Sequence, residues 1–416
     1  MFRRGTTESR VFLPLVGVLL LLAGFFGGVA TDRTGILPGA IVQEPSSVAS
    51  TFRVFWESWN LVHQQYVDRA AVNDTNMTYG AIAGMLQSLG DTGHTRFLSP
   101  NDLRNEEAAL SGHFEGIGAE VTMQDGRPTV VAPIPGSPAQ QAGLRPGDVI
   151  VRVDGRDVAG LSLDAVLNLV RGPSGTSVTL SILHPGEMTV TDITIVRAPI
   201  TVHSVSWTEV PGTTIAHVLI SQFAEKATEE LRAALNSAQT ANVTGIVLDL
   251  RNDPGGLRDE AIGVASQFLR EGNVLIEQNA EGKRTNYRVR SGGVALDIPI
   301  VVLINEGTAS AAEIVAGALQ DQRRGTLIGT TTFGTGTVLS TYTLSDGSAV
   351  LLGTAEWLTP NGRQIWHQGI TPDVQVTLAT DVLPLVPDEE ATLTAAQLKA
   401  SQDTQLLRAL QELSQK

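Results

Sequence analysis

The sequence predicts an α/β protein made of a helical N-terminal module, a β-rich domain with one helix, and a core in which helices cover a sheet. Three observations predict this class. Apolar residues recur with a helical period from Phe52 onward, and short β-branched runs separated by Gly, Pro and Asp fill residues 112–199. Strands then alternate with helices through residues 200–380, a rhythm typical of a helix-covered sheet.

The composition limits the partners and the chemistry. A chain of 416 residues, 42% of them apolar, is expected to fold into more than one domain. A net charge of −14 repels phosphate backbones, so nucleic acid is not an expected partner. The absence of cysteine excludes disulfides and a thiol nucleophile. The seven histidines form no H-E-x-x-H motif or close pair, so neither a catalytic metal nor a cofactor is expected.

The first 30 residues predict export. Three arginines precede the uncharged apolar run 11–30, which is long enough to cross a bilayer. The basic flank keeps the amino end inside, so the rest of the chain is expected on the extracytoplasmic side, in the cell envelope or periplasm. Small residues up to Ala30 also suit signal-peptidase cleavage, so residues 1–30 are either a signal peptide or a membrane anchor.

Residues 31–51, rich in Gly, Pro and Ser, are predicted to be a linker. Residues 52–111 form the N-terminal helical module, with one helix from Phe52 and a second over 78–90, "TYGAIAGMLQSLG".

Residues 112–199 are predicted to hold five short strands and one helix, Leu163 to Val170. The strands are "GIGAEVTM", "PTVVAPI", "DVIVRVDG", "SVTLSIL" and "DITIVRA".

Residues 200–380 are predicted to form the helix-covered sheet, followed by a C-terminal loop and helix over 381–416. In such sheets the chemistry gathers at the carboxyl ends of the strands. The strands are "TIAHVLI", "TGIVLDL" and "IPIVVLI", the helices 226–238, 259–269 and 311–320. The final helix places leucines 406, 407, 410 and 413 on one side.

Three strand ends carry candidate chemistry. "GIVLDLRNDPGG", residues 245–256, ends in two glycines whose N–H groups could approach an oxyanion, or which simply form a turn. "INEGTASAAEIVAGAL" places Ser310 at the start of a helix, where it is either a nucleophile or the cap of an S-x-x-E capping box with Glu313. "GTTTFGTGTVLS", residues 329–340, holds Thr335 on a tight turn.

Taken together, these motifs are specific. "FEGIGAEV", "SPAQQAGLRPGDVIVRVDGRDVAG", "VLDLRNDPGGL", "INEGTASAAEIVAGALQD", "IGTTTFGTGTV" and "TPNGR…GITPDV" occur in this order. From about Phe52 to the end, the chain resembles the carboxyl-terminal processing peptidases, also called tail-specific proteases. The resemblance implies that 112–199 is a PDZ domain and 200–380 the tail-specific protease core. It also implies that Gly116, Ile117, Gly118 and Ala119 form the loop that captures a peptide's terminal carboxylate.

The resemblance also implies a serine peptidase site with a serine-lysine dyad. The family's serine corresponds to Ser310, and its oxyanion donors to the main chain of Ala311 and of Gly255 and Gly256. In its F-G-K-G-T motif, however, the lysine position is Thr335. The glutamine that orients the lysine corresponds to Leu339.

These two substitutions remove the proton acceptor. A lysine amine, with an ordinary pKa near ~10.4, becomes a base only when burial disfavours its charged form, whereas threonine has no comparable ionisation. Loss of one member of a serine catalytic unit costs roughly 10⁴ to 10⁶ in rate. None of the chain's four lysines lies in the motif.

Two functions follow. In the first, the chain is a pseudo-peptidase that binds C-terminal tails of envelope proteins, or a regulator that pairs with an active relative. In the second, it is an active endopeptidase with another base, for which His367, Asp253 and Glu313 are the titratable candidates. The resemblance further implies self-association, since helices before the PDZ segment serve it in some relatives.

Overall fold

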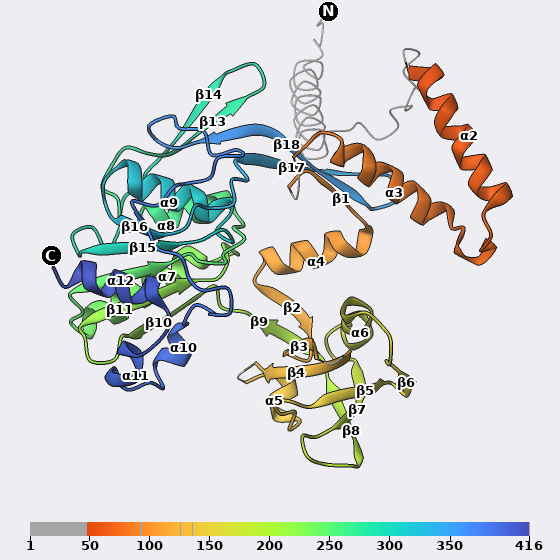
Figure 1. The fold of residues 1–416 in the computed structure, drawn as a ribbon, viewed down its shortest axis with the longest axis horizontal. Coiled ribbons are helices and arrows are strands. Elements are labelled where there is room, and N and C mark those ends of the chain that lie inside the picture. Colours follow the sequence, from red (N-terminus) through yellow and green to blue (C-terminus); the bar gives the residue numbers. More distant parts are fainter. Residues whose placement is uncertain (1–47, 92–93, 125, 135, 416) are drawn as a thin grey trace, which may run out of the picture. The chain divides into compact units, whose positions relative to one another are not determined.

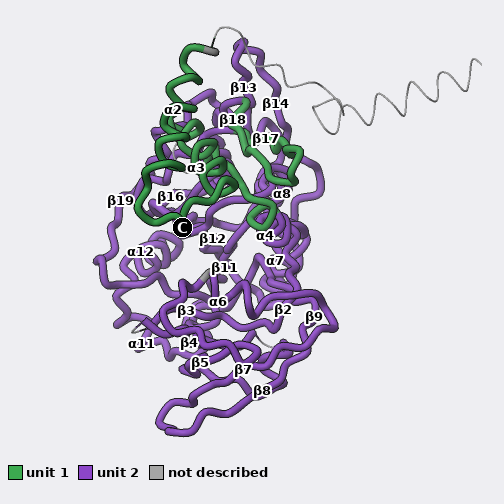
Figure 2. The backbone as a smooth tube through the Cα atoms, turned by 90° about the vertical axis from the view of Figure 1, so that its right-hand side faces the viewer, with its two compact units in different colours: residues 1–103, 338–354 green, residues 104–337, 355–416 purple. Residues whose placement is uncertain are grey.

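The computed structural model describes residues 48–91, 94–124, 126–134 and 136–415. The predicted export segment, residues 1–30, lies outside this part of the chain. Among the described residues, no helix is both long and apolar enough to span a bilayer. The chain divides into two compact units: residues up to 103 with 338–354, and residues 104–337 with 355–416 (Figure 2).

The first unit contains the helical module. It consists of α2 (Ala49–Gln65), a 3₁₀ turn η2 (Arg69–Ala71), α3 (Asp74–Gln87) and β1 (Arg96–Leu98). The second helix begins four residues before the predicted start, because the Asn73 side chain accepts the N–H of Asn76 and caps it there. Strands β17 (Thr337–Thr343) and β18 (Ala349–Leu358) pair with each other, and β1 pairs with residues 349–351 of β18.

The β-rich part of the second unit follows α4 (Pro100–Leu110) and contains the predicted five strands and helix (Figure 1). Its sheet has the order β3-β4-β5-β7-β8, which leaves β3 at one edge. The strands are β3 (Ala119–Gln124), β4 (Arg127–Pro133), β5 (Val149–Val153), β7 (Ser177–Leu183) and β8 (Val190–Val196), with β6 (Arg156–Asp157) paired to β5. The helices are α5 (Pro138–Gln141) and α6 (Leu163–Val170); a separate ladder joins β2 (His113–Gly116) to β9 (Ala198–Thr201).

Apolar side chains of this part form one core. Val130, Ile150, Val166 and Leu180 are all buried in it. Helix α6 contributes Val166, packs against β3 and β5, and is capped by Ser162, whose side chain accepts the Ala165 N–H. Along β3, half-buried residues alternate with exposed ones, as expected for a strand with one covered face.

The α/β core is built on a six-stranded sheet of order β10-β11-β12-β15-β16-β19. All neighbours pair in parallel except β10 and β11. The strands are β10 (Val205–Glu209), β11 (Ile215–Ile220), β12 (Gly245–Asp249), β15 (Ile300–Ile304), β16 (Thr326–Gly329) and β19 (Val374–Gln375).

Helices cover both faces of this sheet, and every residue of the central strands β12 and β15 is therefore buried. Helix α12 (Thr404–Leu413) packs on the face that carries Val247 and Val301. The remaining helices are α7 (Ala227–Thr240), α8 (Arg258–Ala265), α9 (Ala311–Asp321), α10 (Pro387–Glu390) and α11 (Ala395–Lys399). Of the predicted leucines of the last helix, 406 and 413 are buried and 407 and 410 are half-buried.

A hairpin of β13 (Asn273–Asn279) and β14 (Arg284–Arg288) lies in the segment between the second and third predicted core strands. β13 also pairs with residues 355–358 of β18. Neither strand was predicted from the sequence. The fold class is nevertheless the predicted one, a mixed α/β chain with a β-rich domain before a helix-covered sheet.

Candidate active site

The three predicted strand ends lie at one edge of the core sheet. β12, β15 and β16 run parallel, so the segments that follow them emerge on the same side. Asn305 ties the first two together, because it donates to Asn252 Oδ1 and accepts the Asn252 N–H, both at 2.8 Å. Thr308 reaches both neighbours: its hydroxyl donates to Leu250 O, and its carbonyl accepts the Phe333 N–H.

Ser310 occupies a strained position at the start of α9. It is the N-cap residue, with φ 52° and ψ −115°, a backbone conformation that residues with a Cβ rarely adopt. Its N–H donates to Glu313 Oε2 at 2.9 Å and to Thr335 Oγ1 at 2.7 Å. The nucleophile and capping interpretations therefore do not exclude each other, since Glu313 holds the main chain of Ser310 through a capping box.

Glu313 is the hub of the site. Its side chain is fully buried and accepts five hydrogen bonds from neutral donors. Oε1 accepts from the Thr332 hydroxyl and the Gly334 N–H, and Oε2 accepts from the N–H of Ser310 and from both the hydroxyl and the N–H of Thr335. No cation of the described residues forms an ion pair with it. The sequence signal was the S-x-x-E pattern, which did not reveal the donors from 332–335.

Thr335, predicted at the family's lysine position, lies directly beside Ser310. The side chain is buried, and its hydroxyl accepts from the Ser310 N–H while donating to Glu313 Oε2 at 2.7 Å. This hydroxyl thus links the main chain of Ser310 to the side chain of Glu313. Leu339, predicted at the glutamine position, is a half-buried residue of β17 in the first unit.

Among the described side chains, none accepts a hydrogen bond from the Ser310 hydroxyl. Glu313 is bonded to the Ser310 N–H rather than to the hydroxyl. His367 is exposed, its ring stacks on Trp366 with a centroid distance of 4.6 Å, and its main-chain N–H donates to Gly334 O. Asp253 is bonded to Gly255.

The turn of Gly255 and Gly256 lies against Ser310, and only glycine fits there. Gly255 has φ 97°, and a Cβ on it would lie 2.7 Å from Ser310 Cβ and 2.8 Å from Ala311 N. A Cβ on Gly256, with φ 140°, would lie 2.4 Å from Phe223 O. The two predicted segments of the oxyanion site are therefore adjacent.

The predicted donor set needs one correction. The Gly255 N–H donates to Asp253 Oδ1 at 2.7 Å, so it does not face a ligand. Within the described part of the chain, no protein group accepts the Gly256 N–H or the Ala311 N–H. These two donors, at the amino end of an 11-residue helix, could bind a developing oxyanion.

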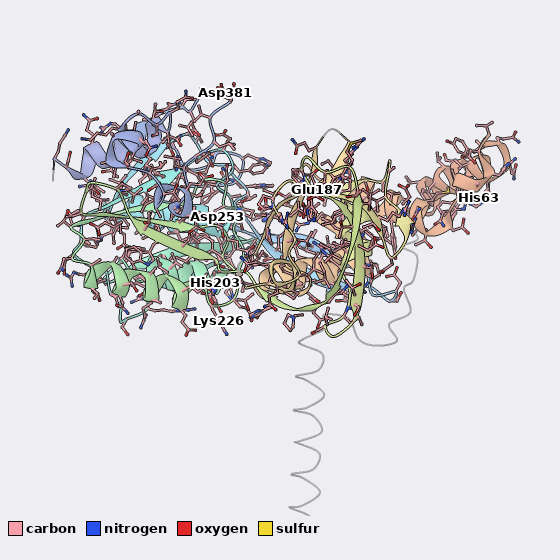
Figure 3. All side chains as sticks on the ribbon, turned by 90° about the horizontal axis from the view of Figure 1, so that it is seen from below. His63, Glu187, His203, Lys226, Asp253 and Asp381 are labelled. Carbon is pink, nitrogen blue, oxygen red and sulfur yellow. The ribbon has the colours of Figure 1, made fainter. Side chains whose placement is uncertain are left out.

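Asp253, labelled in Figure 3, begins this turn, and its side chain is fully buried. Burial raises the pKa of its carboxyl well above the usual range; the Gly255 N–H acts in the opposite direction and the nearby Asp249 charge adds to the rise. Its Oδ2 has no hydrogen-bond partner. A buried carboxyl with a raised pKa therefore stands next to the candidate anion site.

A buried ionic network surrounds Asp249, the last residue of β12. His217 lies between Asp249 (Nε2–Oδ2, 3.0 Å) and Glu390 (Nδ1–Oε1, 2.6 Å). Arg251 binds Asp249 and also Asp403, the residue that caps α12. Burial disfavours the charged imidazole, but its bonds to the two carboxylates outweigh this and raise the pKa of His217 to about 9.

The predicted carboxylate-binding loop of the β-rich domain also has free donors. Gly116 ends β2 and Ala119 begins β3, and between them no described group accepts the N–H of Ile117 or Gly118. Gly118 has φ 73°, and its carbonyl accepts from the Ser137 hydroxyl at 2.7 Å and from the Ile134 N–H. The loop leads directly into the edge strand β3, beside α6.

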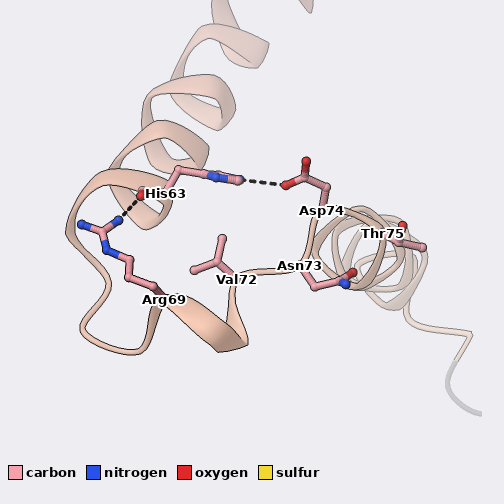
Figure 4. A pocket seen from close by; sticks show the side chains of 6 residues that line it. All are labelled: His63, Arg69, Val72, Asn73, Asp74 and Thr75. Carbon is pink, nitrogen blue, oxygen red and sulfur yellow. Dashed lines mark hydrogen bonds and ion pairs between the residues drawn. The ribbon is translucent and has the colours of Figure 1, made fainter.

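The first unit contains a separate hollow of about 510 Å³ in the turn between α2 and α3 (Figure 4). His63 Nε2 lies 3.0 Å from Asp74 Oδ1, and Arg69 binds the His63 carbonyl. These contacts join the two helices, and the lining holds no serine. The lining residues are His63, Arg69, Val72, Asn73, Asp74 and Thr75.

Across the described residues, no cluster of His, Asp or Glu could hold a metal ion.

Comparison with known proteins agrees with the fold and the motifs. The sequence profile of "Peptidase family S41" matches residues 214–376, and that of "PDZ domain" matches residues 129–183. A carboxyl-terminal-processing protease of Synechocystis is 34% identical over 405 residues, covering 91% of this chain and 92% of that protein. The carboxy-terminal processing protease CtpA of Bacillus subtilis is 37% identical over 366 residues, covering 88% and 78%.

A solved structure shares the fold. The crystal structure of a putative S41 protease from Bacteroides fragilis covers 86% of this chain and 96% of its own, with a TM-score of 0.53 and 18% identity. The two profile matches identify the β-rich part as a PDZ domain and the helix-covered sheet as an S41 peptidase core. The chain belongs to the carboxyl-terminal processing peptidases of family S41, which confirms the predicted family.

Proposed function

We propose that the protein is an exported pseudo-peptidase of the carboxyl-terminal processing family, which binds protein C-terminal tails and cleaves them slowly or not at all. The observation that carries this proposal is the use of the Thr335 hydroxyl. It is bonded to the Ser310 N–H and to Glu313, and a hydroxyl so placed cannot take the Ser310 proton. Donors for an oxyanion remain, but they do not activate a nucleophile.

Tail binding is assigned to the PDZ domain. Free N–H groups at Ile117 and Gly118 precede an edge strand, so a peptide could place its terminal carboxylate on the loop and extend the sheet along β3. This geometry supports unfolded tails of envelope proteins as the partner class. Binding of a peptide to the full chain should be lost when its C-terminal carboxylate is amidated.

Residues 1–30 support the extracytoplasmic location, either as a cleaved signal peptide or as a membrane anchor. Helix α2 supports self-association or pairing with an active relative, because aromatic residues such as Phe52 and Trp56 are exposed on it.

The second candidate is an active C-terminal processing endopeptidase with a different base. Asp253 favours this candidate, because burial raises the pKa of its carboxyl, which is the direction that strengthens a carboxylate as a base. The geometry does not support this candidate, because the Asp253 carboxyl is bonded to the Gly255 N–H and not to the Ser310 hydroxyl.

One experiment separates the two. The full chain is incubated with an unstructured protein that ends in apolar residues, alongside Ser310→Ala and the double variant Thr335→Lys with Leu339→Gln. The pseudo-peptidase should leave the substrate intact, and the double variant should gain cleavage that a further Ser310→Ala change abolishes. Cleavage by the parent that Ser310→Ala removes would refute the proposal.

A further inference from the structure

The strand-end turn 253–256 contains a buried acid, Asp253, whose hydrogen bonds are to main-chain groups of the site. Asp253 has no exposed surface, and it makes two different contacts with the site. Its side-chain Oδ1 accepts the Gly255 N–H at 2.7 Å. Its main-chain oxygen accepts the Ala309 N–H at 2.9 Å.

These two contacts join the two segments that carry the free donors. Gly255 precedes Gly256, and Ala309 lies two residues before Ala311. A Cβ on Gly255 would lie 2.8 Å from Ala309 O, so the two segments already touch. If Asp253 Oδ1 did not accept the Gly255 N–H, this turn would contain a second free N–H beside that of Gly256, and either one could point towards Ser310.

We infer that Asp253 is the positioning residue of this turn: it takes the Gly255 N–H and the Ala309 N–H, so that the N–H groups of Gly256 and Ala311 are the ones presented. It acts through these main-chain groups and does not itself touch a ligand. The inference rests on the proposed role of this turn as an anion site.

The second carboxyl oxygen of Asp253, Oδ2, makes a negative charge at this position unfavourable. Oδ2 is buried without a partner, and a charged carboxylate there would be strongly disfavoured. Burial therefore favours an uncharged acceptor at this position, and an amide of the same shape should replace the carboxyl. An apolar side chain of similar volume should not.

Amide hydrogen exchange of the full chain tests this without turnover. Labelling of the Pro254–Gly255 and Gly255–Gly256 pairs assigns the two glycine amides by NMR. In the parent, the Gly255 amide should exchange about tenfold more slowly than the Gly256 amide, the protection expected of one buried hydrogen bond. Equal exchange, or a better protected Gly256, would overturn the inference.

Two variants and a control separate positioning from general stability. Asp253→Asn should keep the protection of Gly255 and leave the Gly256 and Ala311 resonances in place, whereas Asp253→Leu should lose the protection and move both. Asp148→Leu removes a buried acceptor in the PDZ domain and should change none of the three amides. Loss of protection in Asp253→Asn as well, or equal shifts in Asp148→Leu, would contradict the inference.

Should Asp253→Leu fail to fold, the exchange ratio of the parent and the result for Asp253→Asn still decide. Because the readout is amide exchange, a parent that proved to be an active peptidase would refute the proposed function but leave this inference standing.

Discussion

The main-chain N–H of Ser310 donates to the hydroxyl of Thr335 at 2.7 Å, and the same hydroxyl donates to Glu313 at 2.7 Å. Thr335, the residue predicted at the family's lysine position, is thus part of the scaffold that holds Ser310 in its strained conformation. Threonine serves here as a structural link, because its donor and its acceptor both have protein partners.

Thr335→Val should destabilise the protein. Valine has the same shape but no hydroxyl, so the Ser310 N–H and the buried Glu313 carboxylate each lose a partner. The expected loss is about 1–3 kcal/mol in the free energy of unfolding by urea, the usual net contribution of two hydrogen bonds at about 0.5–1.5 kcal/mol each. Thr285→Val, at an exposed position of β14, should stay within about 0.5 kcal/mol of the parent. Equal stability of the two variants would show that the link is not used.

Gly255→Ala should disrupt the contact between the turn and Ser310. The added Cβ would lie 2.7 Å from Ser310 Cβ, and φ 97° is unfavourable for alanine. Gly155→Ala is the matched control, since Gly155 also has a positive φ, 77°, but nothing within 4 Å of its Cβ. Thermal unfolding should show a clearly larger loss for Gly255→Ala than the roughly 1 kcal/mol expected for the control. A loss no larger than that of the control would mean that the segments can move apart freely.

Gly118→Ala should weaken the binding of peptides with a free C-terminal carboxylate. A Cβ there would lie 2.5 Å from Ser137 Cβ, so the loop must shift and move its N–H groups. A loss of about tenfold or more in affinity is expected, the equivalent of one charge-assisted hydrogen bond. Gly126→Ala, in a turn with positive φ and open space, should bind as the parent does. Unchanged affinity of Gly118→Ala, measured by fluorescence anisotropy, would place the binding site elsewhere.

The sequence predicted the elements with a strong period or a strong boundary. Helix α6 was expected at 163–170 and lies there, and α9 ends one residue after its predicted end. The β13–β14 hairpin was missed because its second strand, "RTNYR", is polar and largely exposed, so its residues carry no alternating apolar signal.

The site was predicted less completely than the fold. Parallel strand ends were expected to meet, and they do, because neighbouring parallel strands share one carboxyl edge. The five donors around Glu313 and the bond between Asp253 and Gly255 were not predicted. Both depend on which buried oxygen finds which N–H across segments far apart in sequence, and residue spacing carries no such information.

Asp253→Asn should stabilise the protein at neutral pH. The folded pKa of the carboxyl is raised by burial, so its contribution to stability is fully present below the unfolded pKa of about 3.9 and is lost as pH rises towards the folded value. The amide has no such dependence. Urea unfolding should show little difference between variant and parent near pH 4 and a growing advantage of the variant towards pH 7. A variant that loses stability towards pH 7 relative to the parent would indicate an ionised Asp253.

His217 should make stability fall on the alkaline side. Its pKa of about 9 in the folded protein exceeds the unfolded value of about 6.5, so its contribution is fully present below pH 6.5 and is lost as pH rises through 9. The shift corresponds to roughly 3 kcal/mol. His217→Gln should be less stable than the parent at pH 6 and should show a shallower decline between pH 6.5 and 9. His203→Gln, which changes a largely exposed histidine paired with Glu230, should keep the slope of the parent.

The titration of His217 should also loosen the C-terminal helix α12. Asp249 joins His217 to Arg251, and Arg251 holds Asp403, the residue that caps α12. Faster amide exchange in residues 404–413 of the parent at pH 9 than at pH 6, after correction for intrinsic rates, would show it. An α12 that exchanges equally at both pH values would separate the imidazole charge from the docking of that helix.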